Sequence, residues 1–278
     1  MSELPYVRQP VDFTGLRYAL GPDSQRRSGV PVGRIDEFVL DDSRAYPGTH
    51  RKYWVYIPQQ YSEPEPACLM VFQDGALYMD PAEDLRVPVV LDNLIHAAEM
   101  PVTIGVFIDP GVFPDAAQPR NRNNEYDAFD DVYAGFVIDE VVSAVQASYR
   151  IADDPDRWAI GGGSSGGNCS FTAAWMRPDR FRRVLSFLGS FAQIPGGNPY
   201  PELVRSSPPK PLRIFMQVAS RDIGYNRPEL NWLSENLQVS AALADRAYDF
   251  RMVLGDGGHN PNHAGAILPD ALRWLWAT

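Results

Sequence analysis

The stretch I-G-G-G-S-S-G-G-N-C-S, residues 160–170, places two adjacent serines among five glycines. Such a run can be a flexible linker, a loop that cradles a phosphate, or a sharp turn that presents a nucleophilic serine. A linker is disfavoured, because the run follows a strand-like segment and opens the apolar stretch 168–176, which is typical of a buried helix. The two remaining interpretations both make this run part of a functional site, either for binding a phosphate or for catalysis.

The phosphate-loop interpretation rests on Gly161, Gly163 and Gly166, which fit the dinucleotide-binding pattern G-x-G-x-x-G between a strand and a helix. That pattern is followed, about 20 residues later, by an acidic residue at the end of the next strand. Ser190 lies where the acid is needed, and the nearest acid, Asp179, precedes that strand. The sequence therefore predicts no nucleotide cofactor.

The third interpretation is a nucleophile elbow, which requires the pattern G-x-S-x-G because small neighbours relieve the crowding around a strained serine. Ser164 has a glycine two positions before it and another two positions after it, and so does Ser165. The spacing predicts a nucleophilic serine here and does not choose between the two.

A serine nucleophile needs a general base, most often a histidine. Of the four histidines, His50 precedes an early strand and His96 lies in an apolar helix. His259 and His263 follow directly after the last strand-like segment, and His259 is favoured because two glycines before it allow a tight turn. The two are spaced like a helical metal pair, but Pro261 lies between them and no metal site is expected.

The base in turn needs a carboxylate that fixes its tautomer. In the chain order serine, acid, histidine, the acid should follow the strand before last. Asp222 does so, although an aspartate in a turn could also simply pair with Arg221. Glu229 and Asp256 are weaker alternatives.

Two backbone N–H groups should stabilise the oxyanion of the tetrahedral intermediate. One is that of Ser165, at the start of the helix that follows the elbow. The other should come from the turn after the third strand, Q-D-G-A-L-Y, where Asp74 and Gly75 point to Ala76 as the donor. An ordinary turn at this Asp-Gly pair is the alternative.

Four further residues lie near the expected site without a defined role. Arg122 and Glu125 precede a long helix and could line a pocket or only tie down their loop. Tyr225 and Trp232 follow the candidate acid and could form an aromatic wall. Loops 109–125 and 191–211 are expected to shape the pocket.

Strand-like and helical segments alternate along the chain after an irregular lead-in, residues 1–33. The first two strand-like segments alternate polar and apolar residues, as half-exposed antiparallel strands do, and the next two are continuously apolar, as strands covered on both faces are. The expected strands are 34–40, 51–57, 67–72, 102–108, 157–161, 184–188, 212–218 and 248–254.

Helical periodicity lies between these strands. It is clearest over 130–149, where Val132, Phe136, Val137 and Val141 form one stripe. Two antiparallel strands followed by repeated β-α units predict an α/β protein with a mostly parallel eight-stranded sheet and helices on both faces. Residues 34–278 are therefore expected to form a single domain of the α/β-hydrolase plan.

The composition is compatible with a large core, because 45% of the 278 residues are hydrophobic and 12% are aromatic. A formal net charge of −10 argues against nucleic acid or an anionic membrane as a partner. The sequence shows neither a secretory signal nor a run of about 18 apolar residues. Cys68 and Cys169 are expected to be buried free thiols, and together these features predict a cytoplasmic protein.

The sequence resembles the enterochelin-esterase-like branch of the α/β-hydrolases, which also includes esterase D-like enzymes. The resemblance covers roughly residues 34–278. Its motifs are F-Q-D-G-A-L-Y (72–78), D-N-L-I-H (92–96), N-R-N-N-E-Y-D (121–127), G-G-S-S-G-G (162–167), G-S-F (189–191) and G-G-H-N (257–260).

The resemblance implies Ser164 as the nucleophile, because only Ser164 fits the family's longer elbow G-x-S-x-G-G. It also favours His259 as the base. The implied enzyme is a serine esterase without cofactors whose triad is Ser164, Asp222 and His259, and whose small-molecule substrate is an acyl sugar, a phenolic ester or a lactone. A peptidase or amidase with the same triad is one alternative, and a non-catalytic binding protein of this fold is another.

Overall fold

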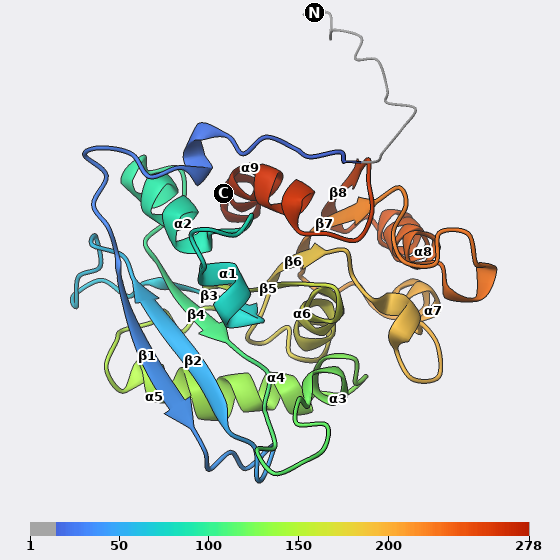
Figure 1. The fold of residues 1–278 in the computed structure, drawn as a ribbon, viewed down its shortest axis with the longest axis horizontal. Coiled ribbons are helices and arrows are strands. Elements are labelled where there is room, and N and C mark those ends of the chain that lie inside the picture. The colour runs from blue at the N-terminus through green and yellow to red at the C-terminus, as the bar shows by residue number, and fades with distance from the viewer. Residues whose placement is uncertain (1–14, 278) are drawn as a thin grey trace, which may run out of the picture.

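The computed structural model describes residues 15–277, which form an α/β fold around one sheet (Figure 1). The sheet has eight strands in the order β1-β2-β4-β3-β5-β6-β7-β8. Strand β2 is antiparallel to both β1 and β4, and the other neighbours are parallel. The strands are β1 Arg34–Leu40, β2 Arg51–Ile57, β3 Cys68–Gln73, β4 Thr103–Ile108, β5 Trp158–Gly163, β6 Arg183–Phe187, β7 Arg213–Ala219 and β8 Asp249–Gly255.

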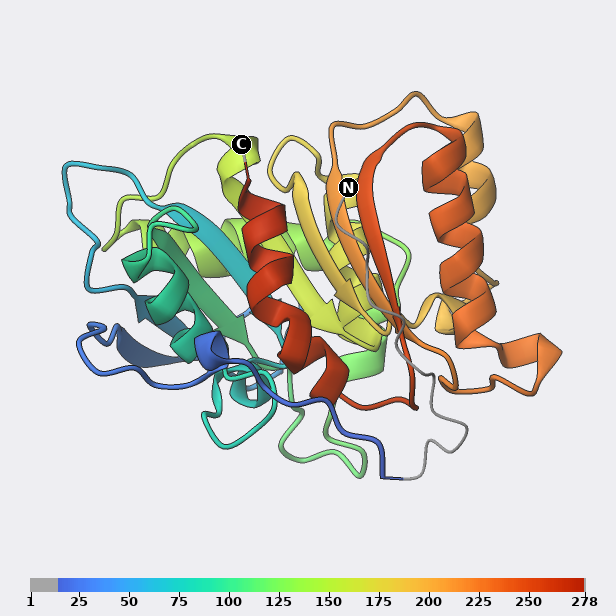
Figure 2. The ribbon, with the colours of Figure 1, turned by 90° about the horizontal axis from the view of Figure 1, so that it is seen from above.

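Helices cover both faces of the sheet (Figure 2), as the α/β-hydrolase plan requires. The larger core cluster packs α4 to α8 against one face, and the second packs α1, α2 and α9 against the other. The helices are α1 Gly75–Met79, α2 Val87–His96, α3 Arg122–Tyr126, α4 Val132–Phe136, α5 Ser143–Gln146, α6 Ser165–Met176, α7 Tyr200–Ser206, α8 Trp232–Asp245 and α9 Asn262–Trp276.

The central strands are buried on both faces because their side chains alternate between the two cores. In β3, Leu69 and Val71 belong to the larger cluster, whereas Met70 and Phe72 belong to the other. This explains the continuously apolar sequence of such strands. The predicted eight strands are confirmed, with their bounds shifted by at most two residues.

The helical stripe predicted over 130–149 is only partly correct. The segment consists of α4, a π-helical stretch at Val137–Val142 and α5. Phe136, Val137 and Val141 are buried as expected, but Val132 is exposed at the start of α4. The extra residue of a π-turn shifts the face that each position presents, and periodicity at 3.6 residues does not anticipate it.

The described part of the lead-in, 15–33, is irregular apart from a 3₁₀ turn at Pro22–Ser24. It nevertheless lies along α2 and α9 (Figure 1). Asp23 pairs with Arg273 of α9 over 2.6 Å, and the side chain of Asn93 in α2 donates to the carbonyl oxygens of Asp23 and Gln25. Residues 15–33 therefore pack against the helices of the segment 34–278.

Cys68 and Cys169 are buried free thiols, as expected. Among residues 15–277, none of the helices combines the length and the apolar character that crossing a membrane requires.

Candidate active site

Ser164 occupies the turn between β5 and α6 with φ 60° and ψ −126°, a conformation that non-glycine residues rarely adopt. The turn is tight, because a Cβ on Gly162 would lie 2.6 Å from the backbone of Gly166. Gly162 is thus required by close backbone approach, whereas a Cβ on Gly166 would lie 3.2 Å from Cβ of Gln73. The glycine run is an elbow between two core elements, with Ser164 at its tip.

Ser165 has a different environment. It is the first residue of α6 and is 1% exposed. Its hydroxyl donates to Asp127 Oδ2 over 3.0 Å, and Ser190 donates to Asp127 Oδ1 over 2.9 Å. The backbone N–H of Ser165 lies in the first turn of α6, where N–H groups have no partner within the helix. The side chain of Ser165 is therefore held by Asp127, while its N–H group remains suited to bind an anion.

His259 and Asp222 form a close pair beside the elbow. Nδ1 of His259 lies 2.6 Å from Asp222 Oδ1, which also accepts the backbone N–H of Ile223 over 2.7 Å. The carboxylate of Asp222 is fully buried, whereas the side chain of His259 is 26% exposed. Trp232, at the start of α8, packs edge-on against the imidazole with 4.9 Å between ring centroids. Asp222 is therefore shielded from solvent, whereas the imidazole of His259 is accessible.

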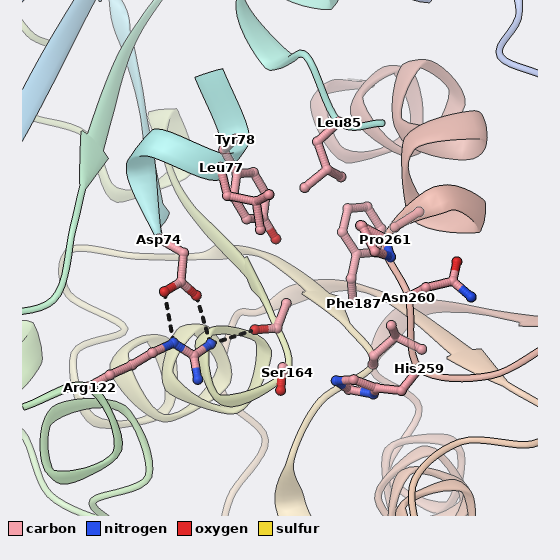
Figure 3. Close-up of a pocket in the computed structure, with 13 residues that line it drawn as sticks. Asp74, Leu77, Tyr78, Leu85, Arg122, Ser164, Phe187, His259, Asn260 and Pro261 are labelled. Atoms are coloured by element: carbon pink, nitrogen blue, oxygen red, sulfur yellow. Dashed lines mark hydrogen bonds and ion pairs between the residues drawn. The ribbon is translucent and has the colours of Figure 1, made fainter. Parts of the chain in front are cut away.

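Ser164 and His259 line the same pocket (Figure 3), which has a volume of about 140 Å³. No hydrogen bond joins these two described residues, and such bonds are often long before substrate binds. The rest of the lining is mainly apolar: Leu77, Tyr78, Leu85, Phe187, Leu188, Pro261 and Ala264. Residues 191–211, expected to shape the pocket, do not contribute to this lining.

Arg122 lines the side of this pocket opposite His259 (Figure 3). Its guanidinium donates from Nε and Nη2 to the two carboxylate oxygens of Asp74, each over 2.7 Å. Burial would lower the pKa of Arg122, but the hydrogen bonds and charge of Asp74 outweigh burial and raise it. The pocket wall therefore carries a fixed ion pair whose charges cancel.

Glu125 anchors its loop to the core. It pairs with Arg51 through two hydrogen bonds of 2.7 and 2.8 Å, and both side chains are fully buried. Glu125 Oε1 also accepts the N–H of Gly111 over 3.0 Å. Arg122 thus lines the pocket and Glu125 ties down the loop, and each pairs with a different residue.

The structure gives Ala76, the second predicted oxyanion donor, a different hydrogen-bond partner. Its N–H donates to Asp109 Oδ1 over 3.0 Å, and Ala76 is absent from the lining of the Ser164 pocket. The Asp74–Gly75 pair is not an ordinary turn with glycine at positive φ, because Asp74 itself adopts φ 53° and α1 begins at Gly75. This places Ala76 in the first turn of α1 with its N–H toward Asp109.

The other candidates lie apart from this constellation. Tyr225 is 49% exposed and Glu229 is exposed, and neither lines the pocket. His263 stacks on Tyr18 with 4.2 Å between centroids and receives a hydrogen bond from Gln217 over 3.1 Å. Trp232 supports His259 and does not form a pocket wall. The contacts of Asp127 were missed: it ends the motif at 121–127, but its partners Ser165 and Ser190 belong to motifs that are distant in sequence.

Comparison with known proteins places this chain among esterases. A family model described as "Putative esterase" matches residues 44–261. An iron(III) enterobactin esterase of Dickeya dadantii is 29% identical over 272 residues, covering 92% of this chain and 56% of that protein. One of Escherichia coli is 29% identical over 141 residues, covering 51% of this chain and 32% of that protein. The matched part of this chain thus spans 56% of the length of the first relative and 32% of the second.

Solved structures show the same fold. The ferric enterobactin esterase of Salmonella typhimurium has a TM-score of 0.74 at 22% identity, covering 93% of this chain and 62% of that one. A ferulic acid esterase of the fungus Anaeromyces mucronatus has a TM-score of 0.67 at 14% identity, covering 92% and 94%. With the family model spanning most of the sequence, the chain belongs to the putative esterase family, and it has the α/β-hydrolase fold of these structures.

Proposed function

We propose that this protein hydrolyses carboxylic esters through an acyl-enzyme intermediate on Ser164. The observation that carries the proposal is the shared pocket, in which a strained serine at an elbow lies with a histidine whose Nδ1 contacts a buried carboxylate over 2.6 Å. This is the constellation of a serine, a base and an orienting acid that activates a hydroxyl.

The pair of Asp222 and His259 defines which nitrogen acts as the base. A carboxylate only accepts hydrogen bonds, so the ring nitrogen that contacts it, Nδ1, carries the proton. Nε2 is then unprotonated and is free to take the proton of the Ser164 hydroxyl as the oxygen attacks the ester carbonyl. The resulting imidazolium returns the proton to the leaving alcohol, and Asp222 stabilises the positive charge meanwhile.

The oxyanion is stabilised at the start of α6. The N–H of Ser165 directly follows the attacking residue, and the positive end of the helix dipole lies at the same position. Water then attacks the acyl-enzyme with His259 again acting as the base, and the acid is released. Neither a metal nor an organic cofactor takes part in this scheme.

The pocket favours a small, uncharged group. Its volume of about 140 Å³ and its apolar lining suit a short acyl chain or a single ring, since a cavity of about 150 Å³ holds benzene. We infer an acyl sugar, a phenolic ester or a lactone as the substrate class.

Matched chromogenic substrates test the proposal. We expect the protein to hydrolyse p-nitrophenyl acetate and to be much slower on p-nitroacetanilide, and a fluorophosphonate should form an adduct on Ser164 that mass spectrometry locates. Faster cleavage of the anilide would favour a peptidase or amidase. A folded sample that forms no adduct and cleaves neither substrate would favour a binding protein.

A further inference from the structure

Tyr18, in the segment that precedes the sheet, contacts the loop of His259 on both of its sides. Its hydroxyl accepts the N–H of Asp256 over 2.7 Å and donates to the carbonyl oxygen of Asp256 over 3.2 Å. Its backbone N–H donates to Asn262 Oδ1 over 2.6 Å, and Asn262 Nδ2 donates back to its carbonyl oxygen over 3.1 Å. Asp256 and Asn262 lie three residues before and three residues after His259.

Tyr18 is itself held firmly. Its ring stacks on the imidazole of His263, which Gln217 of β7 anchors. Asn262 also donates to Asp84 over 2.9 Å, which links the same contact to the loop before α2. The side chain and the backbone of Tyr18 thus connect both ends of the loop with Gln217 of β7, through His263, and with Asp84, through Asn262.

The loop between these anchors has little stiffness of its own. Gly257 and Gly258 precede His259, and Gly257 adopts φ 109°, which L-residues with side chains rarely do. From outside the stretch, the N–H of Arg221 donates to the carbonyl oxygen of Gly257 over 2.9 Å. Within it, the N–H of Asn260 donates to the carbonyl oxygen of Gly258 over 3.0 Å, and the N–H of Asn262 donates to Asn260 Oδ1 over 3.1 Å. A catalytic group has to stay within about 0.5 Å of its productive position, so such a loop needs outside support.

We propose that Tyr18 is a positioning residue for His259, so that a segment outside the sheet and its helices sets the accuracy of the catalytic base. The inference rests on the proposed function, because it concerns the base of that reaction. Tyr18 acts on kcat through the orientation of His259. It leaves KM nearly unchanged, because it does not line the Ser164 pocket.

The test compares Tyr18→Phe, which keeps the stacked ring and the peptide contacts, with Tyr61→Phe, which removes a single hydroxyl contact to the N–H of Arg150. We expect Tyr18→Phe to lower kcat and the rate of fluorophosphonate labelling by about tenfold, because small displacements of catalytic groups are costly, while KM stays within about twofold. Tyr61→Phe should match the parent protein.

A double-mutant cycle separates positioning from general destabilisation. In a His259→Ala background, Tyr18→Phe should have no further effect on the slow residual labelling, because the group it orients is gone. An equal loss in both backgrounds would overturn the proposal, as would a Tyr18→Phe protein with parent kcat per titrated active site. Full activity of Ser164→Ala would instead refute the proposed function itself, so the two failures are distinguishable.

Discussion

Ser165 donates its hydroxyl to Asp127 Oδ2 over 3.0 Å, so the second serine of the doubled motif is bound to a carboxylate outside the Ser164 pocket. Through Ser190, the same carboxylate is linked to Ser164, because the N–H of Ser190 donates to the carbonyl oxygen of Ser164 over 3.1 Å. Asp127 therefore anchors the elbow through residues that do not line the Ser164 pocket. The two adjacent serines therefore differ in their surroundings. Ser164 lines the pocket, whereas the hydroxyl of Ser165 is bound by Asp127.

Substitution of the two serines should give opposite results. We expect Ser164→Ala to lower kcat by about 10³-fold or more with nearly unchanged stability, because it removes the attacking oxygen and no core volume. Ser165→Ala keeps its N–H and most of its activity, but it should lose about 1–3 kcal/mol of unfolding free energy, because Asp127 loses a buried hydrogen-bond partner. Esterase assays and urea titration measure both, and the reverse pattern would make Ser165 the nucleophile.

Asp222→Asn should slow the reaction strongly. An amide can donate to Nδ1, which favours the tautomer whose Nε2 carries the proton and cannot act as a base. We expect kcat to fall on the order of 10⁴-fold, the loss seen for this exchange in serine proteases. Because the pair acts as a unit, His259→Ala and the double variant should be nearly equally inactive. The exposed Glu229, changed to Gln, is the control, and parent-like activity of Asp222→Asn would remove Asp222 from the triad.

Arg122→Met should leave the Asp74 carboxylate in a mainly apolar pocket with only the more distant Arg120, 3.9 Å away, to compensate it. We expect KM for a neutral ester to rise by about tenfold, equivalent to about 1.4 kcal/mol. Arg122→Lys should restore it poorly, since an ammonium does not bind a carboxylate through two parallel hydrogen bonds. Adding Asp74→Asn to Arg122→Met should recover part of the loss. Additive losses in the double variant would contradict this account.

Glu125→Gln should destabilise the protein without directly altering the chemistry. The exchange leaves Arg51 charged in a site where both side chains are fully buried, and breaking such a pair typically costs about 3–5 kcal/mol. Urea unfolding measures the loss. The exposed pair of Lys52 and Glu37 offers the matched control, because Glu37→Gln should change stability by less than about 1 kcal/mol. Equal effects of the two exchanges would show that the buried pair has no special weight.

His263 should make stability fall in mild acid. Burial lowers the pKa of His263, and the charge of Asp256 opposes this only in part. The unfolded chain therefore binds more protons than the folded one once the pH drops below about 6.5, and the unfolding free energy decreases there. His263→Phe keeps the stacked ring and should flatten the dependence of Tm on pH between 7 and 5. His96→Gln, at an exposed helix end, should not, and an unchanged slope in His263→Phe would exclude His263 as the source.

The strands and most of the site were predictable because local sequence determines them. A strand between two cores must be apolar throughout, as Leu69 to Phe72 are, and an elbow must have glycine where backbones meet. Asp222 and His259 follow from the positions of parallel strand ends at one edge of the sheet. The partner of the Ala76 N–H was not predictable, since the positive φ lies on Asp74 and not on Gly75 and the N–H donates to Asp109. Asp127 and Tyr18 were missed because their contacts are separated by 38 and 238 residues.

The separation between Tyr18 and Asp256 also has a consequence for the order of assembly. Contacts that close a long stretch of chain form late, because the entropy of bringing distant segments together must be offset by structure already in place. β5 and α6 build the elbow from residues that are neighbours in sequence. The loop of His259, after β8, is held only when the segment that contains Tyr18 packs against it. During refolding, native secondary structure should therefore return before esterase activity does, and the last event should be the docking of the segment that contains Tyr18.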